Sequence, residues 1–231
     1  ASQCMHAVIG YFSGNFLDFV RFQCRMRKTE TKMQKTHVAI ALDNSGSMDH
    51  IRRQAVIAYN AMLKKIRSME DKENDVRVSF WTFNGGTVRK YFNRAASSVE
   101  DLTLDGYIPS GSTNLYGTVN TMIDELRKIP DEPECAFLLL IVTDGEDTCD
   151  YGTGLSQMKS KIASVSSTGR WTIGFQVPDN YVAGFSSRSG VSRDNIFGWS
   201  SDSKGIAAAT QANEQAIERY AVRSEERRVG K

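Results

Sequence analysis

Three short polar stretches of the chain carry side chains that could bind a hard metal ion. "DNSGS" begins at residue 43, "PSGSTN" at residue 109 and "TDGE" at residue 143. Their candidate ligands all offer oxygen, and they are Asp43, Ser45, Ser47, Thr113 and Asp144. Carboxylate and hydroxyl oxygens suit hard cations, whereas sulfur and imidazole ligands favour softer metals. The set therefore predicts a site for a hard divalent cation.

The spacing within "DNSGS" favours a shared direction for its three ligands. Alternate side chains of extended backbone point to the same side, which would place Asp43, Ser45 and Ser47 together. We expect Gly46 to let the backbone bend into a helix that starts near Asp49. Mg²⁺ prefers compact octahedral coordination and keeps several waters, so small hydroxyls with one or two carboxylates suit Mg²⁺ or Mn²⁺.

The hydroxyl ligands of this set also predict what the ion would bind. Serine and threonine hydroxyls are neutral, so they leave the charge of a divalent cation incompletely compensated. Such a cation attracts a further anion, and an Asp or Glu carboxylate of a protein partner could complete its coordination. We therefore expect a binding function that captures an acidic side chain through the metal.

Apolar stretches stand directly before two of the polar ones. "THVAIAL" (36–42) precedes Asp43, and the continuously apolar "CAFLLLIVT" (135–143) precedes Asp144. A continuously apolar strand is typical of the middle of a parallel sheet that is covered on both faces. Ligands of open parallel sheets bind beyond the carboxyl ends of the strands. If these two strands are neighbours, Asp43, Thr113 and Asp144 all lie at one edge of the sheet.

Segments of helical and strand period alternate through the rest of the middle of the chain. Helices are expected at 49–69, 155–166 and 203–222, with a short helical or irregular stretch near 180–190. A further helix is expected from Leu115 to Ile129, and Thr113 or Asn114 could cap it. Further strands are expected at 75–83, 87–92, 171–177 and 195–199. "NGG" joins the first two of these, and its glycines would supply the positive φ angles of a tight hairpin.

This alternation predicts an α/β fold with a doubly wound, mostly parallel sheet, helices on both faces and one antiparallel hairpin at an edge. At 231 residues, the chain is long enough for one domain with a substantial core. We expect that domain to span 36–223. Residues 1–35 are expected to form an N-terminal extension outside the fold, and residues 224–231 a tail.

Composition narrows the possible partners. A net charge of +2 gives little attraction to nucleic acid. Trp81, Trp171 and Phe175 lie on predicted strands at core-like spacing, so we expect them to pack and not to stack on bases. No stretch reaches the roughly 18 apolar residues of a membrane helix. The four cysteines share no metal-ligand spacing, which favours reduced thiols. We expect a soluble, cytoplasmic protein without nucleic-acid or membrane partners.

The polar stretches together resemble a known motif. "DNSGSM", Thr113 in a "GST" loop and Asp144 in "TDGE" are similar to the metal-ion-dependent adhesion site (MIDAS) of von Willebrand factor type A (VWA) domains. The alternation of strands and helices over residues 36–222 fits that family as well. The resemblance implies that Ser45, Ser47 and Thr113 bind Mg²⁺ or Mn²⁺ directly. It implies that Asp43 and Asp144 bind the ion directly or through water.

Other hypotheses remain open. A metal-dependent phosphoester hydrolase of the haloacid dehalogenase type also carries an aspartate after its first strand, but that family would need a second aspartate where Ser45 stands. Motifs of serine hydrolases, phosphate-binding loops and dinucleotide sites are absent from the sequence, so we do not expect an enzyme. Some members of the resembled family are regulatory partners of an ATPase, which is a third possibility.

Several polar residues near the candidate ligands have simpler interpretations. We expect Glu146, Asp147 and Asp150 to form a solvated acidic loop outside the metal site. His50 is interpreted as a surface histidine. Cys149 is expected to be inert, because nothing near it in the sequence would activate its thiol.

Overall fold

The computed structural model describes residues 33–130, 132, 135–150 and 152–200 of the chain. These residues form a six-stranded sheet with the order β3-β2-β1-β4-β5-β6. Its strands are β1 (Gln34–Asp43), β2 (Asn74–Phe83), β3 (Thr87–Ala95), β4 (Cys135–Val142), β5 (Trp171–Pro178) and β6 (Ile196–Trp199). Only β3 runs antiparallel to its neighbour, β2; the other pairs are parallel. The predicted mostly parallel sheet with an antiparallel hairpin edge is confirmed.

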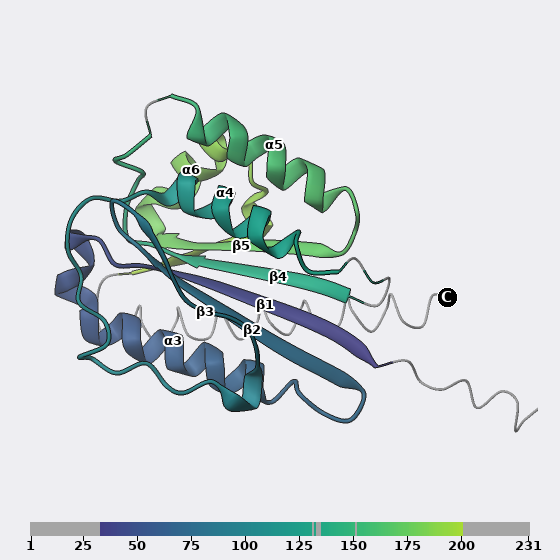
Figure 1. The fold of residues 1–231 in the computed structure, drawn as a ribbon. Coiled ribbons are helices and arrows are strands. Elements are labelled where there is room, and N and C mark those ends of the chain that lie inside the picture. Colours follow the sequence, from purple (N-terminus) through teal and green to yellow (C-terminus); the bar gives the residue numbers. More distant parts are fainter. Residues whose placement is uncertain (1–32, 131, 133–134, 151, 201–231) are drawn as a thin grey trace, which may run out of the picture. The chain divides into compact units, whose positions relative to one another are not determined.

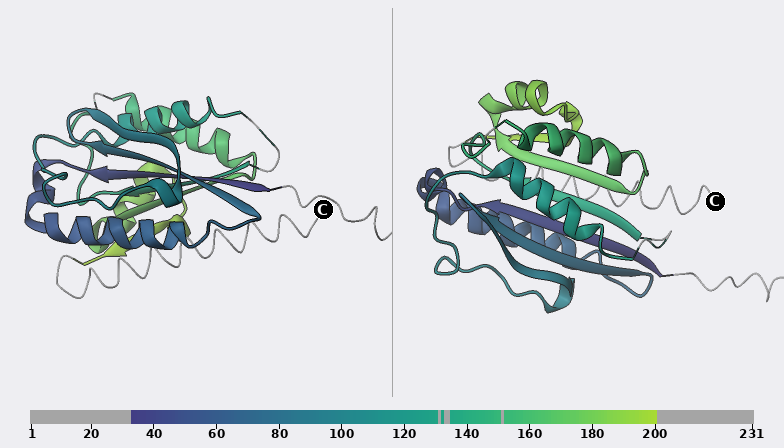
Figure 2. Two further views of the ribbon diagram at one scale, coloured as in Figure 1. Left: turned by 60° about the horizontal axis from the view of Figure 1, so that its bottom comes forward. Right: turned by 45° about the horizontal axis from the view of Figure 1, so that its top comes forward.

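Helices cover both faces of this sheet, as predicted. Helix α3 (Arg52–Arg67) lies on one face, and α4 (Leu115–Leu126), α5 (Gly154–Ser166) and α6 (Val182–Ser189) lie on the other (Figures 1 and 2). Short 3₁₀ turns complete the set at η1 (Gly46–Ile51), η2 (Ala96–Ser98), η3 (Asp179–Tyr181) and η4 (Arg193–Asn195). None of the described helices is long and apolar enough to span a bilayer.

The apolar side chains divide into two cores, one on each face of the sheet. Alternate residues of β1 explain the division, since Ile40 packs in the core under α3 while Ala41 packs in the core under α4 and α5. All eight residues of β4 are buried, and this strand lies between β1 and β5. The sequence prediction of a central strand covered on both faces is confirmed.

The aromatic residues expected in the core do pack there. Trp171 stacks on Phe137 with ring centroids 4.3 Å apart. Phe175 is fully buried against Phe185, and Trp81 is 1% exposed. These rings stabilise the fold by burying apolar surface and are not available to stack on nucleic-acid bases.

Two local predictions were wrong. The helix expected over 49–69 is divided: a 3₁₀ turn begins at Gly46, and the α-helix runs only from Arg52 to Arg67. The glycines of "NGG" do not have positive φ angles. The hairpin closes instead through Asn84, whose backbone N–H donates to the carbonyl of Gly86 at 2.9 Å and whose side chain accepts from the Gly86 N–H at 3.2 Å.

The expected helix at 203–222 and tail at 224–231 lie outside the described residues. So does most of the expected extension at 1–35, of which only the last residues are described; β1 begins at Gln34.

Candidate metal centre

The strands that carry Asp43 and Asp144 are neighbours at the centre of the sheet. β1 pairs in parallel with β4, and Leu42 lies opposite Val142 in the register. The strand order reverses here, because the chain crosses from β1 to the α3 face and from β4 to the opposite face. In open parallel sheets such a switch point creates a crevice between the two outgoing loops. The sequence prediction that these loops share one edge is confirmed.

A chain of hydrogen bonds connects four of the five predicted ligands. The Oδ1 atom of Asp43 accepts a bond of 2.7 Å from the backbone N–H of Ser45. The hydroxyl oxygens of Ser45 and Ser47 lie 3.0 Å apart, and the Ser47 hydroxyl donates to Oδ1 of Asp144 at 2.8 Å. Asp43 and Ser45 are buried, whereas Ser47 is exposed. The cluster therefore runs from the core outward and opens to solvent at Ser47.

Asp43 is the buried end of this cluster. Its Oδ2 atom accepts a hydrogen bond of 2.5 Å from the hydroxyl of Thr143. Burial raises the pKa of the Asp43 carboxyl to about 6, although the hydrogen bonds from Thr143 and Ser45 oppose the rise. The nearby charge of Asp144 raises the pKa further. A bound cation would compensate the negative charge that this site otherwise keeps in a poorly hydrated place.

Thr113 reaches the same edge through the backbone of its loop. The N–H of Gly46 donates to the carbonyl of Gly111 at 2.9 Å, which joins the Thr113 loop to the loop after β1. Thr148 holds the other side of the Thr113 loop. The Thr113 N–H donates to the Thr148 hydroxyl, and the Thr148 N–H donates to the Thr113 carbonyl, both at 2.8 Å. Thr113 is 4% exposed. All three predicted loops thus meet.

Gly46 does not act as expected. Its φ is not in the left-handed region, so the bend into η1 uses a conformation open to any residue. Gly111 is the glycine that the site requires, because its φ is +77°.

The acidic loop after β4 was also misinterpreted. The carboxylate of Asp147 accepts from the N–H groups of Tyr116 and Cys149, both at 2.7 Å, and so satisfies the start of α4. The side chain of Asn114 makes no capping bond there. Asp150 accepts from the N–H of Gly154 at 2.8 Å, at the start of α5. Of the three acidic residues predicted to be solvated, only Glu146 has no structural contact of this kind; it forms an exposed ion pair with Arg188.

His50 lies at the surface, as predicted, whereas the inertness of Cys149 stays a prediction. His50 is exposed, and its Nδ1 lies 2.5 Å from the carbonyl of Ser47. Cys149 is a free thiol whose Sγ lies 3.2 Å from the hydroxyl of Ser112. Cys135 is buried in β4.

The arrangement fits a small hard cation. Two adjacent ligands of an octahedral ion with bonds of about 2.0–2.1 Å lie about 2.9 Å apart. The separations of 3.0 Å from Ser45 to Ser47 and 2.8 Å from Ser47 to Asp144 match that edge. The described residues contain no cluster of three or more His, Cys, Asp and Glu side chains able to hold a metal. The candidate set has only two carboxylates among its five side chains, and its other three are hydroxyls.

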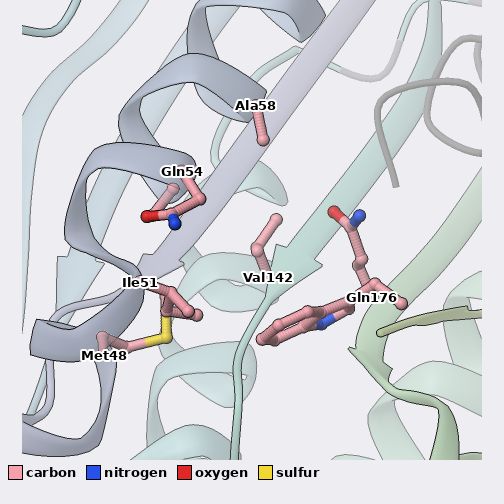
Figure 3. A pocket seen from close by; sticks show the side chains of 8 residues that line it. Met48, Ile51, Gln54, Ala58, Val142 and Gln176 are labelled. Atoms are coloured by element: carbon pink, nitrogen blue, oxygen red, sulfur yellow. The ribbon is translucent and has the colours of Figure 1, made fainter. Parts of the chain in front are cut away.

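An apolar pocket of about 30 Å³ lies beside η1, the 3₁₀ turn that contains the candidate ligand Ser47 (Figure 3). Met48 and Ile51 form one wall, and Val142, Gln176 and Trp199 line the side toward the sheet. The lining is mostly hydrocarbon, and the space would hold little more than water molecules. Neither a metal ion nor a phosphate ester suits it.

Two solved structures with a similar fold are described as a von Willebrand factor type A protein and a vWF domain. A von Willebrand factor type A protein from Catenulispora acidiphila aligns with a TM-score of 0.58 and 16% identity, over 81% of this chain and 43% of that one. The vWF domain of the type V pili tip protein Mfa5 from Porphyromonas gingivalis aligns with a TM-score of 0.58 and 12% identity, over 80% of this chain and 96% of that one. The described part of the chain has the VWA fold.

A third structure with this fold is the pilus adhesin SpaC from Lactobacillus rhamnosus GG, with a TM-score of 0.58, 13% identity, and coverage of 80% of this chain and 30% of that one. The chain therefore spans less than half the length of two of these proteins and nearly all of the VWA domain of Mfa5. No protein-family model matches the sequence, and no curated protein aligns with it significantly. The likeness is thus one of fold.

Proposed function

We propose that the chain is a protein-interaction module that binds Mg²⁺ or Mn²⁺ beyond the carboxyl ends of β1 and β4 and captures an Asp or Glu side chain of a partner through the ion. The observation that carries this proposal is the chain of hydrogen bonds that runs from buried Asp43 through Ser45 and Ser47 to Asp144. The VWA fold supports it, because two of the similar structures are pilus proteins by name, one of them an adhesin.

The exposed end of the cluster is where a partner would dock. Ser47 is exposed, while Asp43 is fully buried, so a cation held between them has one side toward solvent. A bound divalent cation would supply a positive charge that accepts a carboxylate oxygen. Three of the candidate ligands are neutral hydroxyls, which preserves much of that charge. The residues themselves orient the ion, and the proposal makes the chain a binding module and not an enzyme.

The two alternative functions gain no specific support. A phosphoester hydrolase of the expected type needs a second carboxylate at position 45, but the Ser45 hydroxyl lies against Ser47. The role of regulatory partner of an ATPase stays a prediction from the resemblance alone. A cytoplasmic location likewise stays a prediction.

Calorimetric titration of Mg²⁺ into metal-free protein tests the site. The wild type is expected to bind, and Ser47→Ala is expected to bind roughly tenfold more weakly because a ligand oxygen is lost. Ser167→Ala is the matched control: this exposed serine follows the last residue of α5, and its hydroxyl donates only to the Ser164 carbonyl in the described contacts. Equal binding by wild type, Ser47→Ala and Ser167→Ala would contradict the assignment.

A second experiment tests the partner chemistry. Binding to immobilised peptides that contain a single Asp, Asn or Ala at one position is measured with Mg²⁺ and with a chelator. Retention should require both the carboxylate and the metal. Retention that is unchanged by the chelator would rule out capture through the ion.

A further inference from the structure

The segment from Val99 to Ser112, which we call the strap, lies along α3. It ends against residues 43–47, the loop after β1 that carries three of the candidate ligands; we call this loop the metal loop. The strap has no regular secondary structure, yet polar side chains of α3 hold it at several points. Three α3 side chains donate to strap carbonyls: Arg67 to Val99, Asn60 to Leu102, and Arg52 to Leu104 and Tyr107. Such contacts satisfy backbone groups that a loop otherwise leaves to water.

Arg52 holds the end of the strap that is nearer the site. It is the first residue of α3, its Nε donates to the Tyr107 carbonyl at 2.7 Å, and its Nη2 donates to the Leu104 carbonyl. Both bonds are charge-assisted, which makes them stronger than bonds between neutral groups. Arg52 therefore fixes the backbone of Tyr107 relative to the helix.

Tyr107 carries this fixation to the metal loop. Its side chain is 1% exposed, and its hydroxyl donates a hydrogen bond to the backbone carbonyl of Asp43. The donor thus holds the last residue of β1 at the point where the candidate ligands begin.

Two more contacts follow along the strap. The N–H of Ser110 donates to the Asn44 carbonyl at 2.8 Å, and the Gly46 N–H donates to the Gly111 carbonyl at 2.9 Å. With the Tyr107 bond, the strap crosses the metal loop at three successive places. Thr113 follows directly after the strap, so the same segment also places the ligand of the second loop.

We propose that Tyr107 and Arg52 are positioning residues that arrange the oxygen atoms of the candidate site before any ion binds. This inference rests on the proposed function. A loop that is already ordered loses less conformational freedom when the ion binds, which strengthens binding without adding a ligand. Neither residue touches the candidate ligand oxygens; both act through backbone groups.

Tyr107→Phe tests the inference, because it removes one hydroxyl and keeps the buried ring. Tyr59→Phe is the matched control: Tyr59 is equally buried, and its hydroxyl bonds to the Tyr91 hydroxyl and to no strap group in the described contacts. Mg²⁺ titration, thermal unfolding and amide exchange of Gly46 in metal-free protein are measured for both. Tyr107→Phe should bind Mg²⁺ roughly tenfold more weakly, in the range seen when outer-shell partners of a metal site are lost.

The exchange measurement gives a readout that needs no metal. The Gly46 amide should exchange several-fold faster in Tyr107→Phe than in wild type and in Tyr59→Phe, even where the two variants lose similar thermal stability. Arg52→Met should show the same two effects, and Arg67→Met should not, because Arg67 holds the far end of the strap at Val99 and Asp101.

The outcomes separate the two proposals. If the wild type does not bind Mg²⁺, the proposed function is wrong, and the Gly46 exchange alone decides whether the strap orders the loop. If the wild type binds and Tyr107→Phe binds equally well, the inference about positioning is overturned while the metal site stands. Unchanged Gly46 exchange in Tyr107→Phe overturns it as well.

Discussion

The hydroxyl of Ser47 donates a hydrogen bond of 2.8 Å to the carboxylate of Asp144, although 97 positions separate the two residues. Ser47 lies in the turn after β1, and Asp144 follows β4, so this contact bridges the two loops at the switch point of the sheet. It defines the opening of the candidate metal centre. Asp43 is the opposite, buried end of the same cluster.

Asp43→Asn should separate metal binding from stability. Asp43 is fully buried, and its ionised form has little solvent around it in the metal-free protein. The neutral amide can accept from the Ser45 N–H and donate to Thr143, so the metal-free variant should be as stable as the wild type or about 1 kcal/mol more stable at pH 7.5. The increase in Tm that Mg²⁺ gives the wild type should be lost.

Thermal unfolding of both proteins, with and without Mg²⁺, checks this prediction. If the Tm of Asp43→Asn rises with Mg²⁺ as much as that of the wild type does, Asp43 takes no part in binding the ion.

Asp147→Ala should destabilise the fold by about 1–2 kcal/mol, because two backbone N–H groups lose their acceptor, including the one of Tyr116 at the start of α4. Glu146→Gln is the neighbouring control. Its exposed ion pair with Arg188 should contribute less than about 1 kcal/mol. Urea unfolding of both variants measures the difference. Similar losses for the two would mean that Asp147 is a solvated surface residue after all.

Gly111→Ala should cost about 1 kcal/mol or more, because its φ of +77° is unfavourable for a residue with a Cβ atom. Gly46→Ala should be nearly neutral. A Cβ atom there would lie 3.5 Å from the Gly111 carbonyl oxygen, which is an ordinary contact, and its φ is outside the left-handed region. The free energies of unfolding in urea compare the two. A larger loss at Gly46 than at Gly111 would reverse the assignment of the essential glycine.

His37 should make stability fall in acid. Burial lowers the pKa of its imidazole from 6.5 to about 4, and the ring stacks on Phe137 with centroids 5.3 Å apart. Above pH 6.5 the residue is neutral in both states and has no effect. Between pH 6.5 and 4 the unfolded chain protonates His37 while the folded chain does not, so this residue lowers the stability by up to roughly 3 kcal/mol. Asp43, whose pKa burial raises to about 6, acts in the opposite direction over the same range.

Urea unfolding at several pH values checks this expectation. Between pH 6.5 and 4, His37→Gln should lose less stability than the wild type does, because the unfolded variant no longer gains the proton of His37. If His37→Gln retains the full slope, another group is responsible.

The sequence by itself determined the elements and the ligand candidates, because both are local properties. The spacing of apolar residues predicted α4, and apolar runs predicted β1 and β4. The continuous run of β4 also predicted its place at the centre of the sheet. The oxygen-rich stretches stood out by composition alone. Where local rules compete, as in "NGG" and at Gly46, they predicted turns that the chain makes in another way.

Only the tertiary structure decided which distant groups meet. Adjacency of β1 and β4 brings Ser47 to Asp144, and no periodicity encodes that pairing. Asp147 accepts from Tyr116, 31 positions earlier in the first turn of α4, and Tyr107 reaches Asp43 across 64 positions. Hydrogen bonds of this kind depend on how the sheet orders its strands. The sequence therefore identified the candidate ligand residues, whereas the tertiary structure showed which other residues hold them in place.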